Sequence, residues 1–289
     1  MNFCFSLLLI LSCFNLQAQE KIAEKPQEKP KNLPLWEIGA SVLTFRAPHY
    51  RGSTQHKDYM WPVPYFIIRG KRVQGENSFV RGNFYLSDKM SVDLSMNAGL
   101  NVISAQNHRR EGMSNIWPSF EVGPMVRFFL WHDENKMNLL NLEIPLRASF
   151  ATDFKNIEHI GFYNISYLNL ASRPQDWNLH CSTELSAGPM MASKKWHNYY
   201  YGVSDQFVTP DRARYEAKGG YSGFQIGATV TKRIGDMLIL PFFRYDILNE
   251  AVFDDSPLYQ KNHYAMFGLG FVYFFSKSKE TQGNQFQVR

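Results

Sequence analysis

The chain has 289 residues, of which 44% are hydrophobic and 15% aromatic, and its formal net charge is +5 at pH 7. Its mean hydropathy of −0.34 excludes a bundle of transmembrane helices, but it fits a membrane barrel, in which half of each strand faces a polar interior. The sequence pI is near 9.0, yet no basic run or nucleic-acid motif accompanies it. We therefore expect dispersed surface and lumen charges and no nucleic-acid partner.

The N-terminus predicts export. An apolar run over residues 3–14, followed by residues 15–18, is typical of a secretory signal that is cleaved after Ala18, although no Lys or Arg precedes the run. Residues 1–18 are therefore expected to be a signal peptide. Lipidation of Cys13 is the alternative, because residues 10–13 loosely match a lipoprotein cleavage site. Cleavage after Ala18 would leave Cys181 as the remaining cysteine, so no intramolecular disulfide is expected.

Residues 19–34 combine charged side chains with proline, so we expect a mobile periplasmic tail rather than part of a core. Beyond the tail, apolar and polar residues alternate, most cleanly in residues 90–101. Period two is typical of a strand with two different faces, whereas an amphipathic helix spaces its apolar residues three and four positions apart. The predicted strands are residues 35–45, 61–69, 78–85, 90–101, 118–131, 137–150, 160–170, 177–191, 196–203, 221–231, 237–247 and 265–275.

Strands of about ten residues are long enough to cross a bilayer when they are tilted. A soluble sandwich of this size would have shorter strands, and here the polar rows carry charge or glycine, as expected for a lumen. Closure into a barrel pairs all backbone polar groups, as a bilayer requires. We predict an all-β, antiparallel transmembrane β-barrel over residues 35–275, closed in the outer membrane of a Gram-negative bacterium, with about 12 strands and a range of 10–14.

Seven charged side chains are expected to face the lumen. One interpretation is a pore lining that sets ion preference. The favoured interpretation is a network of Arg–carboxylate pairs that fills and rigidifies a closed lumen, because buried charges need partners. The residues are Glu121, Arg127, Glu143, Arg147, Glu184, Arg244 and Asp246.

Catalytic motifs are weak in this sequence. His180, Ser182 and Glu184 share one face of a predicted strand, but residues two apart on a strand are about 7 Å apart, too far for a nucleophile–base hydrogen bond. The sequence has no nucleophile elbow, zinc-protease motif or P-loop. We therefore expect no enzyme, no catalytic residues, no cofactor and no metal site.

Several segments of the chain carry a family resemblance: residues 48–53, 62–70, 199–204, 215–221, 223–231, 244–246 with Leu248 and Ala251, 255–258, and 268–275. Together they resemble the MipA/OmpV family, which is named after the MltA-interacting protein. Their order and spacing along most of the mature chain make the resemblance specific. The chain departs from the family at its C-terminus, because Phe275 is followed by a polar tail, residues 276–289, where family members usually end at the terminal aromatic residue.

The resemblance implies a non-enzymatic outer-membrane scaffold that links a lytic transglycosylase and a peptidoglycan synthase in cell-wall assembly. Residues 19–34 and 276–289 would then be the partner-binding segments, with uncontacted tails as the alternative. The family-motif loop Asp255, Ser256, Pro257 and Leu258 is expected to fix a loop, because Asp, Ser and Pro form turns. Two other functions stay open: a porin or small-solute channel, and a barrel enzyme that acts on lipid or peptide.

Overall fold

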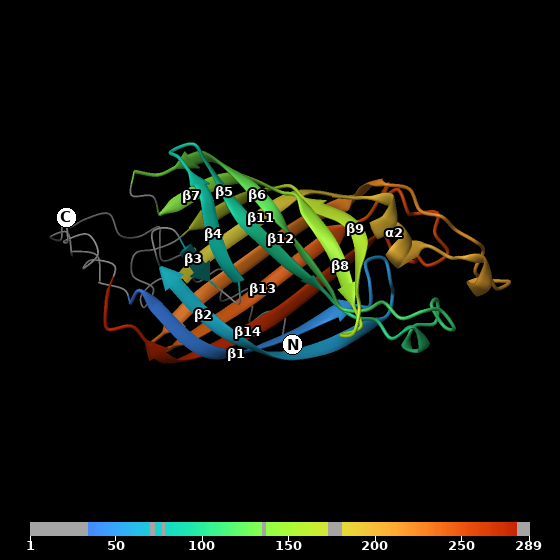
Figure 1. Ribbon diagram of the computed structural model, residues 1–289, viewed down its shortest axis with the longest axis horizontal. Helices are drawn as coiled ribbons and strands as arrows, with labels where there is room; N and C mark the ends of the chain where they lie inside the picture. The colour runs from blue at the N-terminus through green and yellow to red at the C-terminus, as the bar shows by residue number, and fades with distance from the viewer. Residues whose placement is uncertain (1–33, 70–72, 77–78, 135–136, 173–180, 282–289) are drawn as a thin grey trace.

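The strands of the protein form one antiparallel sheet that returns on itself (Figure 1). This computed structural model describes residues 34–69, 73–76, 79–134, 137–172 and 181–281. The strands are β1 (Trp36–Pro48), β2 (His56–Arg69), β3 (Val73–Glu76), β4 (Phe79–Leu86), β5 (Met90–Gly99), β6 (Ser119–His132), β7 (Asn138–Pro145), β8 (Arg147–Thr152), β9 (Ile157–Ile165), β10 (Tyr167–Ser172), β11 (Cys181–Ala192), β12 (Gly220–Ile234), β13 (Met237–Ile247) and β14 (His263–Lys277). The predicted all-β antiparallel fold is confirmed.

The sheet closes through two sets of pairings. β1 pairs with both β2 and β14, and β10 pairs with both β7 and β11. β7 and β8 are successive parts of one wall strand, interrupted at Leu146, and β9 and β10 are parts of another, interrupted at Ser166. The fourteen described strands therefore occupy twelve positions around the wall, the number that the sequence predicts.

Two glycines accommodate these interruptions. A methyl group on Gly123 of β6 would overlap the carbonyl group of Leu146, and one on Gly188 of β11 would overlap the carbonyl group of Ser166. The interrupted strands can therefore approach their neighbours because no side chain stands there.

One predicted strand is wrong. Most of residues 196–203 form the helix α2 (Lys194–Tyr201), which begins at Ser193, where the hydroxyl group accepts a hydrogen bond from the Trp196 N–H. The buried residues of α2 are Trp196, His197, Tyr200 and Tyr201. This spacing places them on one face of the helix, which packs into the core of the protein. The structure adds β3, which the sequence did not predict, and the predicted strand at 177–191 is described only from Cys181 onward, as β11.

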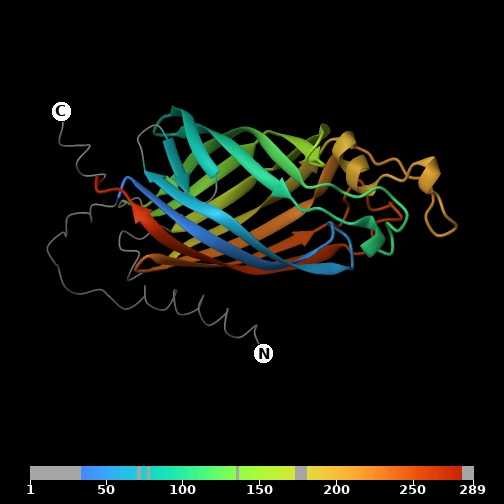
Figure 2. The same cartoon turned by 60° about the horizontal axis from the view of Figure 1, so that its bottom comes forward.

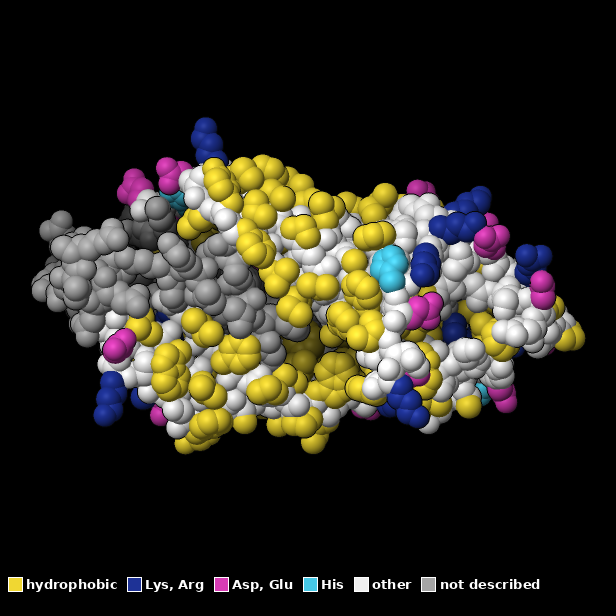
Figure 3. Space-filling view, viewed as in Figure 1, with side chains coloured by type: hydrophobic (Ala, Val, Ile, Leu, Met, Phe, Trp, Pro, Cys, Tyr) yellow, Lys and Arg dark blue, Asp and Glu magenta, His cyan; other side chains and the backbone are white. Residues whose placement is uncertain are grey.

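The two faces of the wall differ as the alternation predicts. Side chains on the outer face are large and apolar, and Figure 3 shows them over the strand region, with charged side chains concentrated toward the two ends. Trp36, Ile38, Phe267, Phe271 and Phe275 are among the exposed ones. Such a surface suits lipid contact. In the described part of the chain, no helix is long and apolar enough to cross a membrane.

The two ends of the barrel carry different connections. Short turns, such as residues 87–89 and 235–236, lie at the end where β1 begins and β14 finishes. Pro34 and Thr281 form a backbone bridge there, so both ends of the described chain leave at one rim (Figure 2). At the opposite end, α2 and residues 100–118, 202–219 and 248–262 form what we call the cap. Its core includes Tyr50, Tyr163, Trp196, Tyr201 and Phe253.

Candidate functional site

The first group of lumen charges is centred on Arg127 of β6. Its Nε atom lies 2.8 Å from Glu143 Oε1, and Nη1 lies 2.8 Å from Asp93 Oδ2. Asn169 Nδ2 donates to Glu184 Oε1 at 2.5 Å and lies 3.4 Å from Glu143 Oε1. The side chains of Asp93 and Glu143 are 1% and 6% exposed, so one guanidinium group compensates two buried carboxylates.

A second pair lies along the same strands. Arg147 Nη1 is 3.9 Å from Glu121 Oε2, and Asn97 Nδ2 donates to that oxygen atom at 3.0 Å. Arg147 Nε also donates to Ser95 Oγ at 2.8 Å. Asn97 and Ser95 are uncharged members of the polar row of β5, and they supply hydrogen bonds that the separated ion pair lacks.

A third group surrounds Asp246 of β13, just below the cap. Arg244 makes a bidentate contact with its carboxylate, with Nε–Oδ1 at 2.9 Å and Nη2–Oδ2 at 2.6 Å. Arg51 Nε lies 2.9 Å from Oδ2, and the Tyr264 hydroxyl donates to the same oxygen atom at 2.7 Å. Gln225 Nε2 donates to Oδ1 at 3.0 Å. Two guanidinium groups therefore share one fully buried carboxylate.

A fourth group, which the sequence did not single out, lies at the rim where the termini leave. Glu37 of β1 is fully buried, and Arg69 of β2 and Arg233 of β12 contact its carboxylate, with Arg69 Nη2–Oε2 at 2.6 Å and Arg233 Nη1–Oε2 at 3.0 Å. Arg233 also lies over the Phe274 ring, 5.0 Å from its centroid. Glu37 belongs to the polar row of the predicted strand at residues 35–45, and this position is the sequence signal that could have identified it as a lumen residue.

The seven predicted lumen residues thus all lie inside the barrel, and the structure brings most of them together in pairs. Arg127 meets Glu143, Arg147 approaches Glu121, and Arg244 meets Asp246. The unpredicted members are Asp93, Glu37, Arg69, Arg233 and Arg51. A pore-lining role for any of these residues stays a prediction.

The cap is fixed by stacked rings and buried hydrogen bonds. Tyr201 and Phe253 stack with centroids 3.8 Å apart, and Tyr163 and Trp196 with centroids 4.7 Å apart. Burial lowers the pKa of His197 from 6.5 to about 4. Because Nδ1 lies 2.6 Å from the Lys218 carbonyl oxygen, it carries the proton, and Nε2 accepts from the Ser222 hydroxyl at 2.6 Å. His197 is therefore a neutral ring within the cap.

The family-motif loop is part of this cap. Ser256 Oγ donates to the Tyr201 carbonyl oxygen at 2.8 Å, and Leu258 is fully buried. Tyr50 Oη donates to the Leu258 carbonyl oxygen at 2.8 Å, and burial raises the pKa of Tyr50 to about 12. Asp255 is exposed and Pro257 is half-buried. This geometry fits the loop-fixing role that the sequence suggests.

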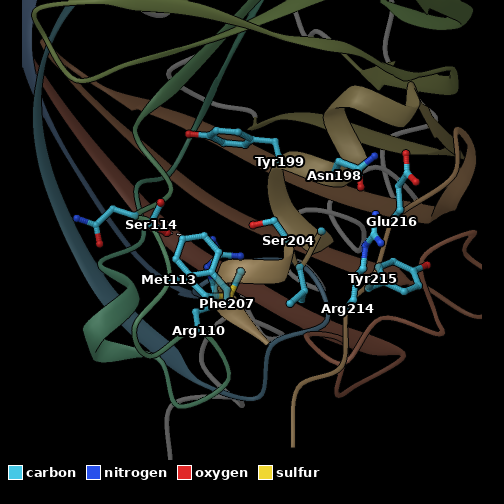
Figure 4. Close-up of a pocket in the computed structure, with 13 residues that line it drawn as sticks. Arg110, Met113, Ser114, Asn198, Tyr199, Ser204, Phe207, Arg214, Tyr215 and Glu216 are labelled. Atoms are coloured by element: carbon cyan, nitrogen blue, oxygen red, sulfur yellow. Dashed lines mark hydrogen bonds between the residues drawn. The ribbon is translucent and has the colours of Figure 1, made fainter. Parts of the chain in front are cut away.

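A cavity of about 390 Å³ opens within the cap (Figure 4). The rings of Tyr199, Phe207 and Tyr215 line it, and so does Arg110. The Arg110 guanidinium group already donates to the Tyr200 carbonyl oxygen at 2.9 Å and to the Ser114 carbonyl oxygen at 3.1 Å. Its charged group therefore braces two cap segments, and no particular ligand chemistry is indicated.

The arrangement offers little for catalysis or metal binding. Ser182 Oγ donates to the Ser172 carbonyl oxygen at 3.0 Å, and His180 lies outside the described residues. Among the described residues, no cluster of three or more His, Cys, Asp and Glu side chains could hold a metal ion. The chemistry visible in the lumen is charge compensation.

Comparison with known proteins identifies the family. The family model of the MltA-interacting protein MipA matches residues 38–275, which includes most of every wall strand. No curated protein matches the chain. Among solved structures, a NanC porin in a rhombohedral crystal form is 9% identical, with a TM-score of 0.37 and coverage of 81% of this chain and 98% of its own. The chain is an outer-membrane β-barrel protein and belongs to the MipA family.

Proposed function

We propose that this protein is a non-enzymatic scaffold of the outer membrane that links a lytic transglycosylase and a peptidoglycan synthase. The observation that carries the proposal is the family match over residues 38–275, because the family is named for interaction with MltA, a lytic transglycosylase. The paired charges of the lumen support a structural role, since Arg127, Arg244 and Glu37 are each held by two or more partners.

The proposed partner surface is the rim where both chain ends leave. Outer-membrane barrels have short periplasmic turns and longer outer loops, so this rim, with its short turns, is assigned to the periplasm. The bridge between Pro34 and Thr281 holds the starts of the two tails side by side. Residues 19–33 and 282–289 lie outside the described residues, and we propose that these tails contact the murein enzymes, which work on the periplasmic side.

The test is co-purification in detergent. The full chain, a variant without residues 19–33 and one without residues 282–289 would each be mixed with a purified lytic transglycosylase and a purified peptidoglycan synthase. We expect the full chain to retain both enzymes and the loss of a tail to reduce retention at least tenfold. Heat-modifiable gel mobility would verify that each variant is folded.

Failure of the folded full chain to retain either enzyme would refute the scaffold. Recording in planar bilayers separates it from the channel alternative. The scaffold proposal predicts no ion conductance, because the lumen charges are paired with one another and fill the lumen instead of lining an open pore. Discrete, reproducible openings would favour the channel and make Arg127, Arg147 and Arg244 the residues to replace.

A further inference from the structure

A second cavity, of about 130 Å³, lies just below the cap. The ends of β1 and β5, the helix α2 and the strands β13 and β14 contribute its lining. Apolar side chains such as Ala47, Leu100 and Met266 lie beside two arginines, Arg51 and Arg244. The cavity shares no described lining residue with the cavity of Figure 4, so the two are separate sites.

The carboxylate of Asp246 beside this cavity has no capacity for a further donor. It accepts five hydrogen bonds, from Nε and Nη2 of Arg244, Nε of Arg51, the Tyr264 hydroxyl and Gln225 Nε2. An ionised carboxylate has about four lone-pair sites. The remaining N–H groups of the two arginines therefore need an acceptor other than Asp246.

Three guanidinium nitrogen atoms have no such acceptor. In the part of the chain that the structure describes, Nη1 and Nη2 of Arg51 and Nη1 of Arg244 make no hydrogen bond. The two side chains are 14% and 24% exposed, and both line the cavity. Arg51 is held in place because its Cζ atom lies 4.8 Å from the centroid of the Tyr163 ring. A fixed pair of donors on Arg51 is thus available to a ligand.

A further donor comes from α2. Trp196 lines the cavity and is 4% exposed, and its Nε1–H has no hydrogen-bond partner among the described residues. Buried N–H groups in native proteins normally have a partner, because an unsatisfied one is destabilising. The Trp196 ring stacks on Tyr163, and the Cζ atom of Arg51 lies 6.0 Å from its centroid. The unused indole and guanidinium donors are therefore neighbours.

The charged side chains around the cavity leave one positive charge without a partner. Arg51 and Arg244 carry two positive charges against the one negative charge of Asp246. The adjoining pair of Arg147 and Glu121 adds no net charge. A monovalent anion would balance the group, whereas a divalent anion would leave a negative charge uncompensated.

We propose that this cavity binds a small monocarboxylate, of which acetate is the simplest probe. The two Nη groups of a guanidinium match the two oxygen atoms of a carboxylate, so Arg51 holds the ligand and Trp196 Nε1 donates to one of its oxygen atoms. Ala47 and Met266 accommodate the short alkyl group. The site does not depend on the proposed scaffold, whose partner surface is assigned to the opposite rim.

The test is nuclear magnetic resonance of the full chain, labelled with ¹⁵N at tryptophan and refolded in detergent micelles with or without sodium acetate. Refolding in acetate loads the site without requiring an entry route. The chain has 6 tryptophans, and the variant Trp196→Phe identifies the indole signal of Trp196. We expect acetate to shift this signal downfield until it saturates and to leave the other indole signals in place. An equal shift of all indole signals would overturn the proposal.

Acetamide and sulfate are the comparison compounds, each at the same ionic strength. Acetamide has the shape of acetate without its charge, and sulfate is a divalent anion. Neither should shift the Trp196 signal at a concentration at which acetate saturates it. An equal shift by acetamide would refute recognition by charge, and an equal shift by sulfate would refute the assignment to a monocarboxylate.

Two variants that remove the same charge test the role of Arg51. Arg51→Gln removes the guanidinium group beside the cavity and should weaken acetate binding at least tenfold. Arg46→Gln is the matched control, because the Arg46 side chain is 59% exposed and does not line the cavity, and it should leave the affinity unchanged. Equal weakening in both variants would overturn the proposal, because it would reflect net charge alone.

A second measurement decides the question if Arg51→Gln does not fold. A ligand that binds the folded chain stabilises it, so acetate should raise the urea midpoint of the wild type. It should do the same for Trp117→Phe, because Trp117 is 44% exposed and lies outside the cavity, but not for Trp196→Phe. Equal rises in all three proteins would refute a carboxylate bound to the Trp196 indole.

Discussion

His197 makes the stability of the cap depend on pH. Its ring is fully buried, between the Lys218 carbonyl oxygen and the Ser222 hydroxyl, and burial lowers its pKa from 6.5 to about 4. Between these two values the unfolded chain binds a proton that the folded chain excludes. Stability is therefore complete above about pH 6.5 and is lost as the pH falls toward 4.

The size of the loss follows from the two pKa values. One pKa unit corresponds to about 1.4 kcal/mol, so the contribution of His197 falls by about 2 kcal/mol at pH 5 and by about 3 kcal/mol at pH 4. Urea unfolding in detergent micelles, followed by tryptophan fluorescence, measures this loss. Trp196 is the neighbouring residue and stacks on Tyr163, so its emission reports the packing of the cap.

The decisive comparison is with His197→Gln, which carries no titrating group. Lys218 and Ser222 keep a polar neighbour in this variant, and the fall in stability between pH 7.5 and pH 5 should shrink by about 2 kcal/mol. The matched control is His263→Gln, because His263 is exposed on the first residue of β14, and it should keep the wild-type slope. If unfolding free energy changed with pH equally in the wild type and in His197→Gln, the interpretation of His197 as a buried neutral ring would be refuted.

Two further predictions concern the wall. Arg127→Gln leaves Asp93 and Glu143 buried without their shared cation and should lower the free energy of unfolding by about 3–5 kcal/mol. The measurement is the urea midpoint at pH 7.5, which should fall. An unchanged midpoint would contradict the prediction and mean that water already compensates these carboxylates. Gly188→Ala places a methyl group against the Ser166 carbonyl group and should lower the free energy of unfolding by about 1–3 kcal/mol. Gly270→Ala is the control, because a methyl group at Gly270 meets its neighbours at ordinary van der Waals distances. Equal folded fractions of these two variants in heat-modifiable gels would contradict the packing argument.

The sequence predicted the wall because the alternation of side chains is a local property. The predicted strand at residues 237–247 coincides with β13, and the segment at 90–101 differs from β5 by two residues at its end. The helix α2 was missed because three consecutive tyrosines, residues 199–201, favour a strand by composition. The spacing of Trp196, His197, Tyr200 and Tyr201 carried the opposite, helical signal.

The ion pairs could not be predicted in the same way. Glu37 meets Arg233, which is 196 positions away along the chain, and Asp93 meets Arg127 across two strands whose register depends on the whole wall. A polar row shows that a charge faces the lumen, but the partner depends on strand order and shear around the barrel. Arg51 had no signal of this kind, because it lies in the loop between β1 and β2, outside any alternating row, and its contact with Asp246 spans 195 positions of the chain.

These contacts also show how side chains occupy the two ends of the lumen. At the rim where both chain ends leave, Glu37 with its two arginines lies beside a buried cluster that includes Tyr65, Leu238 and Phe274. At the other end, the aromatic cap fills the mouth. In the part of the chain that the structure describes, both mouths are therefore occupied by side chains that have ion-pair, hydrogen-bond or packing partners.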